Sequence, residues 1–99
     1  MRNVLVRYRV KPDQVAENEQ LVRAVYEELH HGRPDGFHYA TFKLEDGVSF
    51  VHIAIDETTG ESPLTGLPAF QRFQQDIAER CDEPPVVSTV DRIGSYEFA

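Results

Sequence analysis

Apolar and polar positions alternate along the first ten residues of the chain. Val4, Val6, Tyr8 and Val10 fall on one parity, and Leu5, Arg7 and Arg9 fall on the other. This period of two is typical of a strand whose two faces meet different surroundings. We therefore expect a strand over residues 3–10.

The apolar positions that follow recur at the three- and four-residue spacing of a helix. Pro12 suits a first helical turn, where its missing N–H is not needed. Gly32 followed by Pro34 provides a stop. The pattern predicts a helix that ends near His31 and buries the stripe Val15, Val22, Val25, Tyr26 and Leu29.

Two more strand-like runs, residues 37–44 and 48–56, flank an Asp-Gly pair that favours a tight hairpin turn. Residues 57–66 lack periodicity and are rich in Gly, Thr and Ser, which predicts a surface loop. A second helix is expected from about Pro68 to the Pro84-Pro85 pair. Residues 86–98 again have a strand-like pattern, with Gly94 at a bend. The stripe of the second helix comprises Leu67, Phe70, Phe73, Ile77 and Cys81.

Strand, helix, hairpin, helix and strand is the split βαβ order. It predicts a single α+β domain over residues 1–99, with a ferredoxin-like βαββαβ fold. A four-stranded antiparallel sheet would carry two helices on one face.

The other face of this sheet then needs an explanation. The aliphatic row Val51, Ile53 and Ile55 is suited to the helices, which leaves Phe50, His52 and Ala54 on the open face. The same parity places Leu5, Arg7, Arg9, Phe37, Tyr39 and Thr41 on the open face as well. So apolar a surface indicates an interface or a ligand site.

The last strand suggests what covers this face. Thirteen extended residues would span about 43 Å, which exceeds the expected diameter of about 30 to 35 Å for a domain of this size. We therefore expect a dimeric α+β barrel, a homodimer through the open sheet face in which Tyr96 and Phe98 of the terminal strand lie over the partner.

Charge and composition limit the classes of partner that the chain can bind. The formal charge of −7 opposes binding to nucleic acid or to an anionic membrane. The first ten residues lack the pattern of a signal peptide, so the expected compartment is the cytoplasm. Cys81 is the only cysteine, which excludes an internal disulfide and favours a small core residue.

His52 is the first candidate for chemistry, because an imidazole amid aliphatic neighbours can act as a base near neutral pH. Arg7 and Arg9 are candidates for holding an anionic oxygen, and Tyr39 and Tyr8 for donating hydrogen bonds to a substrate against Phe50. Each also has a structural interpretation, as an interface histidine, ion pairs across a dimer, or core tyrosines. His30, His31 and His38 are better explained as solvated histidines than as a metal site, because adjacent helical positions diverge by about 100°.

The chain resembles the antibiotic biosynthesis monooxygenase-like family of the dimeric α+β-barrel superfamily. The resemblance spans nearly the whole chain. It implies a pocket between sheet and helices, a small phenolic or quinol-type substrate, and monooxygenation without a cofactor. No histidine lies in residues 68–80 to ligate haem, and the chain has no tryptophan, which several active members use. The segments that carry the resemblance are residues 4–12, 50–54, 68–73 and 94–98.

Two functions from different classes stay open. One is a cofactor-independent monooxygenase with His52 as base and Arg7 as anion partner. The other is a non-catalytic dimeric module that binds a small ligand or another chain. An RNA-recognition motif shares the element order, but Asp46 and Val48 stand where that motif needs a basic residue and an aromatic one.

Overall fold

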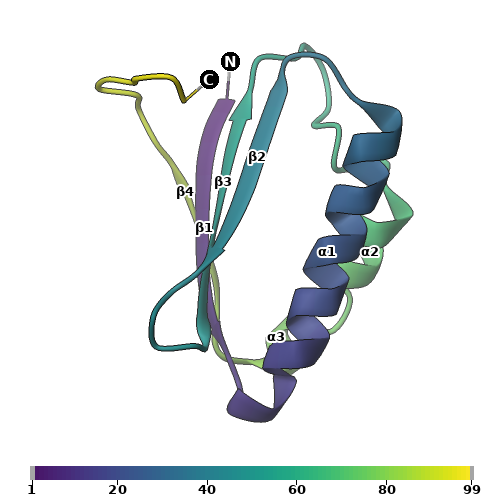
Figure 1. The fold of residues 1–99 in the computed structure, drawn as a ribbon, viewed down its shortest axis with the longest axis vertical. Coiled ribbons are helices and arrows are strands. Elements are labelled where there is room, and N and C mark those ends of the chain that lie inside the picture. Colours follow the sequence, from purple (N-terminus) through teal and green to yellow (C-terminus); the bar gives the residue numbers. More distant parts are fainter. Residues whose placement is uncertain (1, 99) are drawn as a thin grey trace.

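The computed structural model describes residues 2–98 of the chain. Its strands form one antiparallel sheet in the order β2-β3-β1-β4. The helices cover one face of this sheet, which confirms the ferredoxin-like prediction (Figure 1). The elements are β1 (Arg2–Val10), the 3-10 turn η1 (Pro12–Gln14), α1 (Val15–Gly32), β2 (Phe37–Lys43), β3 (Ser49–Asp56), α2 (Pro68–Gln74), α3 (Ile77–Arg80) and β4 (Cys81–Thr89).

The hairpin turn forms for the predicted reason, whereas the first helix ends near the predicted place with Arg33 rather than Gly32 in the left-handed position. Gly47 takes a left-handed φ of 79°, and the Asp46 carboxylate accepts the N–H groups of Val48 and Ser49. Helix α1 extends one residue beyond His31, and Arg33 takes the left-handed position with φ 48°. Both predictions are thus confirmed to within about one residue.

The predicted faces of β2 and β3 were wrong. Residues that lie opposite each other in an antiparallel pair point to the same side of the sheet. Val6 lies opposite His52, and Tyr8 opposite Phe50, so both β3 residues face the helices. Tyr39 and Thr41 of β2 lie opposite Ala54 and His52 and join them. The aliphatic row Val51, Ile53 and Ile55 therefore belongs to the open face.

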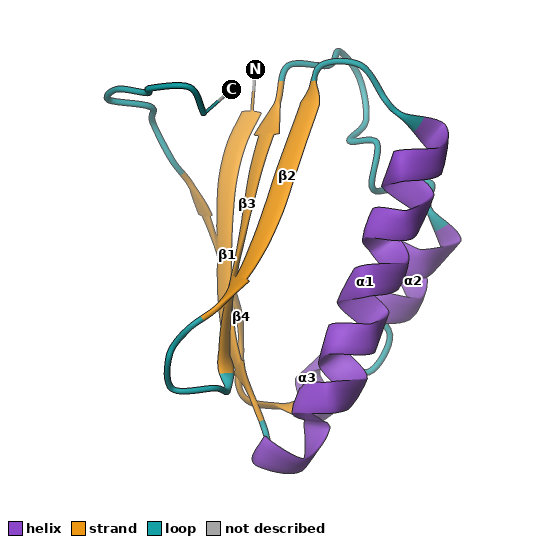
Figure 2. Ribbon diagram, viewed as in Figure 1, coloured by secondary structure: helices purple, strands orange, loops and turns teal. Residues whose placement is uncertain are grey.

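The hydrophobic core lies between the sheet and the helices, which form two layers in Figure 2. Tyr8 and Phe50 stack there, with ring centroids 5.5 Å apart and planes 9° apart. The predicted role of Cys81 as a small core residue is confirmed, although it begins β4 rather than ending a helix. The buried cluster comprises Tyr8, Val10, Val22, Val25, Phe50, Leu64, Ala69, Phe73 and Cys81.

The second helix is interrupted, contrary to the prediction of one helix that extends to Pro84. Asp76 adopts a left-handed φ of 61° and separates α2 from α3. The Arg80 side chain donates to the carbonyl oxygens of Phe73 and Gln75, at 2.6 and 3.0 Å. These bonds satisfy carbonyl groups that the broken helix leaves free.

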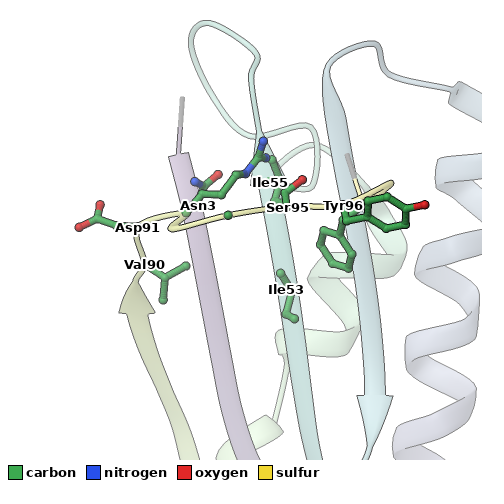
Figure 3. A pocket seen from close by; sticks show the side chains of 10 residues that line it. Asn3, Ile53, Ile55, Val90, Asp91, Ser95 and Tyr96 are labelled. Atoms are coloured by element: carbon green, nitrogen blue, oxygen red, sulfur yellow. The ribbon is translucent and has the colours of Figure 1, made fainter.

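The last strand is also shorter than predicted, because β4 ends at Thr89. Val90 N–H donates to Asn3 O beside the start of β1. Residues 91–98 leave the sheet edge and cross the open face over β1 and β3 (Figure 3). We refer to residues 90–98 as the tail.

Candidate functional site

A cavity of about 460 Å³ lies between the sheet and the second helical segment. Its walls are mainly apolar, and its polar side chains come from β1, β2, β3, the 57–66 loop and α2. The loop was predicted from composition and contributes Ser62 and Leu64. The lining residues are Val4, Val6, Tyr8, Tyr39, His52, Ala54, Ser62, Leu64, Phe70, Phe73, Gln74, Ile77, Pro85 and Val87.

His52 occupies the sheet wall of this cavity, and only 4% of it is exposed. Its Nε2 atom lies 2.7 Å from the Tyr8 hydroxyl oxygen, and its Nδ1 atom lies 2.6 Å from the Tyr39 hydroxyl oxygen. Thr41 Oγ1 lies 3.1 Å from Nδ1. Both ring nitrogens are therefore hydrogen-bonded to neutral hydroxyl groups.

The polar cluster continues away from the cavity to two residues that the sequence patterns did not single out. Asn18 on α1 donates from Nδ2 to the Tyr8 hydroxyl oxygen at 2.9 Å. Arg80 donates from Nε and a terminal nitrogen to Asn18 Oδ1, both at 3.4 Å. Asn18 is completely buried, and Arg80 is nearly so.

A signal for these two residues does exist in the sequence. Asn18 stands three residues after Val15 and four before Val22, so it lies on the buried stripe of α1. Arg80 stands three residues after Ile77 and seven after Phe73, on the stripe of the second helix. A polar residue on an apolar stripe needs a buried partner, and here the two residues partner each other.

Burial sets the protonation of the site. It lowers the pKa of His52 to about 4, because the ring nitrogens are removed from water. The same cause raises the pKa of Tyr8 and of Tyr39 above the ordinary value for a phenol. At neutral pH the cavity wall therefore carries a neutral imidazole between two neutral phenols.

The structure brings together three of the six predicted site residues. Tyr8, Tyr39 and His52 line the cavity, and Phe50 stacks behind Tyr8 without lining it. Arg7 lies opposite Val51, and Arg9 opposite Ser49, on the open face. The prediction that these arginines share the face of His52 was wrong, because the parity of β3 is reversed. Arg9 instead forms a 3.6 Å ion pair with Glu83.

The described residues hold no group of three His, Cys, Asp or Glu side chains arranged to bind a metal ion. His30 and His31 lie in the last turn of α1. None of the helices in residues 2–98 has both the length and the apolar character that crossing a membrane requires.

A second hollow, of about 350 Å³, lies on the open face (Figure 3). Asn3, Ile53 and Ile55 form its floor, and the tail forms its rim with Tyr96 and Phe98. Tyr96 is 85% exposed, and Phe98 is about half exposed. The hollow therefore has an aliphatic floor and an open, aromatic edge.

No protein-family model matches the chain, and no curated protein matches its sequence. Solved structures do match its fold. A putative antibiotic biosynthesis monooxygenase from Nitrosomonas europaea has a TM-score of 0.78 at 16% identity, over 95% of this chain and 100% of that chain. A putative antibiotic biosynthesis monooxygenase from Caulobacter crescentus has a TM-score of 0.72 at 18% identity, with 94% and 90% covered.

A variant of SnoaB from Streptomyces nogalater, described as a cofactor-independent oxygenase, has a TM-score of 0.68 at 17% identity, with 97% and 96% of the two chains covered. The chain thus has the fold of antibiotic biosynthesis monooxygenase structures. The resemblance predicted from the sequence is confirmed at the level of fold.

Proposed function

We propose that this chain is a cofactor-independent monooxygenase that takes a small phenolic or quinol-type substrate into the cavity beside His52. The observation that carries the proposal is the hydrogen-bonded polar trio of Tyr8, His52 and Tyr39 in a mainly apolar cavity. The cavity volume lies within the range of about 300 to 1,000 Å³ usual for small-molecule sites. The shared fold with a cofactor-independent oxygenase supports the reaction class.

The apolar wall would hold the rings of such a substrate. Phe70 and Phe73 stack on each other at 6.0 Å, and Ile77 and Val87 continue this wall. Aromatic ligands gain favourable offset or edge contacts with such rings. Tyr8 and Tyr39 line the same cavity, and in this proposal the Tyr39 hydroxyl meets the substrate oxygen.

The proposed reaction inserts one oxygen atom of O₂. In an anthrone-type phenol a ring CH₂ becomes C=O, and the second oxygen atom leaves as water with the two hydrogens. In a hydroquinone a ring C–H becomes C–OH while the two phenol groups become a quinone, and the second oxygen atom again leaves as water with the two hydrogens that the phenol groups lose. The substrate supplies all four electrons, so no external reductant is needed. The site must favour the ionised substrate, which is the form that O₂ oxidises readily.

His52 is not suited to be the base that the sequence suggested. A phenol has a pKa near 10, about six pKa units above that of His52. In this proposal the substrate loses its proton to water, and His52 stays neutral and holds the two tyrosines.

Oxygen consumption with a panel of hydroquinones and anthrone-type phenols tests the proposal. We expect uptake by the parent protein, undiminished by dialysis against a chelator, and a loss of at least about tenfold in Tyr39→Phe. Arg7→Ala on the open face is the control and should match the parent. A folded parent that consumes no oxygen with any substrate would contradict the proposal.

A non-catalytic binding module is the second candidate, and the structural hydrogen bonds that already join Tyr8, His52 and Tyr39 to one another favour it. A protein of this kind would bind the same phenols without oxygen uptake. Calorimetric binding together with the uptake assay separates the two candidates.

We further propose that the open face mediates a homodimer. Leu5 and the aliphatic row Val51, Ile53 and Ile55 share this face, and the exposed Tyr96 and Phe98 of the tail adjoin it. A second copy would cover an apolar surface that is costly to leave in water. Light scattering at micromolar concentration should give twice the chain mass, and a monomeric mass would contradict this. A cytoplasmic location stays a prediction.

A further inference from the structure

The polar residues behind the cavity form one continuous series of hydrogen bonds. It runs from Arg80 to Asn18, Tyr8, His52 and finally Tyr39, from α3 through α1 to β1, β3 and β2. Every link joins buried or partly buried side chains. The direction of each bond can be assigned from the end at Arg80.

Arg80 fixes the orientation of the Asn18 amide. A guanidinium group has only N–H donors, so the Asn18 atom that faces it must be the carbonyl oxygen. The amide NH₂ group then points to the Tyr8 hydroxyl oxygen, 2.9 Å away. The reverse orientation would place the amide NH₂ donors against guanidinium donors and would leave the bonds that Arg80 Nε and a terminal nitrogen make to Asn18 without an acceptor.

The orientation of the Asn18 amide determines which atom accepts the hydrogen bond from the Tyr8 hydroxyl. The Tyr8 oxygen accepts from Asn18, and among the described side chains the Tyr8 O–H has one acceptor within reach, His52 Nε2 at 2.7 Å. The opposite tautomer would leave a hydroxyl of a residue that is 2% exposed without an acceptor. A buried hydroxyl left unsatisfied is costly.

A neutral imidazole that accepts at Nε2 carries its proton on Nδ1. The Nδ1–H group then donates to the Tyr39 oxygen at 2.6 Å, with Thr41 Oγ1 at 3.1 Å as a second, longer acceptor. Thr41 is also bonded to Tyr26 at 2.8 Å. The Tyr39 O–H is the last donor of the series, and Thr41 is a side-chain hydrogen-bond partner of Tyr39 in the free protein. Tyr39 lines the cavity, so a ligand oxygen would take the place of Thr41 as the acceptor of its proton.

We propose that Arg80 and Asn18 are positioning residues that hold His52 in the Nδ1–H tautomer, so that Tyr39 donates into the cavity. As a result, the site prefers an ionised oxygen, that of a phenolate or an enolate, to a neutral one. The series begins at a cation, and each donor polarises the next. A hydrogen bond to a charged oxygen is stronger than one to a neutral oxygen. The ligand class rests on the proposed function, and the tautomer does not.

The first test reads the tautomer directly in the free protein. Nitrogen-15 NMR of labelled histidine at neutral pH, with His52 assigned by its loss in His52→Ala, should show Nδ1 protonated and Nε2 unprotonated. The Asn18→Asp variant keeps the shape of the side chain and the bond to Arg80, but it presents a carboxylate oxygen, which is an acceptor, to the Tyr8 hydroxyl. The tautomer should therefore change to Nε2–H.

Glu17→Gln, an exposed change beside Asn18 on α1, is the control and should leave the tautomer unchanged. The proposal is overturned if the parent protein shows Nε2–H. It is also overturned if Asn18→Asp and the parent share one tautomer. The spectrum of the parent decides the question even where the variant does not fold.

The second test measures the preference for an ionised oxygen. Binding of 4-nitrophenolate and of the neutral 4-nitroanisole is compared between the parent and Tyr39→Phe. We expect the variant to bind the phenolate about ten- to a hundredfold more weakly, and the neutral compound within about threefold of the parent. Tyr96→Phe, which changes an exposed tyrosine outside both this cavity and the hydrogen-bonded series, is the matched control.

Equal losses for both compounds, or no binding of phenolate by the parent, would overturn the preference. The outcome is distinct from that of the oxygen assay. A protein that binds phenolate through Tyr39 but consumes no oxygen keeps this inference and fails the proposed oxygenase.

Discussion

The two faces of the sheet differ in the side chains that they carry and in what covers them, although neighbouring residues of the same strands form both. The face beneath the helices carries Tyr8, His52 and Tyr39, and each of these polar groups has a partner. The open face carries the aliphatic row of β3, which lies opposite Asn3, Leu5 and Arg7 of β1, and the tail crosses one end of it. A buried face can therefore hold several polar groups, provided that these groups bond to one another.

The largest expected effect comes from truncating a phenylalanine on the helix-covered face. Phe50→Ala should lower the free energy of unfolding by about 3–5 kcal/mol, because a buried ring leaves a cavity. Phe42→Ala on the open face, where that ring is 52% exposed, is the matched control. Its loss should stay below about 1 kcal/mol in urea denaturation. Equal losses of unfolding free energy in the two variants would contradict the distinction between a buried face and an open face.

The pH dependence of stability should report on His52. Its folded pKa, about 4, is lower than the ordinary 6.5, so the unfolded chain binds the proton more readily. Stability is present above about pH 6.5 and falls as the pH is lowered toward 4, by about 3 kcal/mol.

The His52→Gln variant should lose most of this pH dependence, since a glutamine side chain does not titrate between about pH 4 and pH 6.5. Urea denaturation at pH 7, 6 and 5 provides the measurement. A variant whose stability falls with pH as steeply as the parent's would show that other groups carry the effect.

A charge on the open face should act on assembly rather than on the fold. Ile53→Asp buries a carboxylate in the proposed dimer interface, so we expect dimer dissociation to be at least about a hundredfold more favourable. Circular dichroism should stay close to that of the parent. Sedimentation over a concentration series measures the change. A variant that remains fully dimeric would show that the dimer forms through a different surface.

The smallest effect is expected for the arginines. Arg7→Ala and Arg9→Ala should change phenolate binding by less than about twofold, because both lie across the sheet from the cavity. The Arg9–Glu83 pair is exposed and adds little stability. A large loss of binding in either variant would mean that ligands use the open face.

The sequence predicted the fold because each element has its own local signal. Period two, helical spacing, the Asp-Gly turn and the proline positions are all readable within about ten residues. The parity of β3 is different, since Phe50, His52 and Ala54 on one side and Val51, Ile53 and Ile55 on the other are both apolar enough to be buried. Only the partners across the strands decide between them.

Three residues of the candidate site could be predicted from the sequence, but its assembly could not. His52, Tyr8 and Tyr39 stood out by residue type, whereas Arg7 and Arg9 were added by an inverted face. Asn18 and Arg80 escaped notice because their bond joins positions 62 residues apart. The break at Asp76 that brings Arg80 inward has no proline or glycine to mark it.

The most direct test of the account is a crystal structure of the protein with a bound hydroquinone. The account predicts the ring among Phe70, Phe73 and Ile77, with its oxygen within hydrogen-bond distance of the Tyr39 hydroxyl. A ligand bound instead on the open face beneath the tail, with the cavity beside His52 unoccupied, would contradict it.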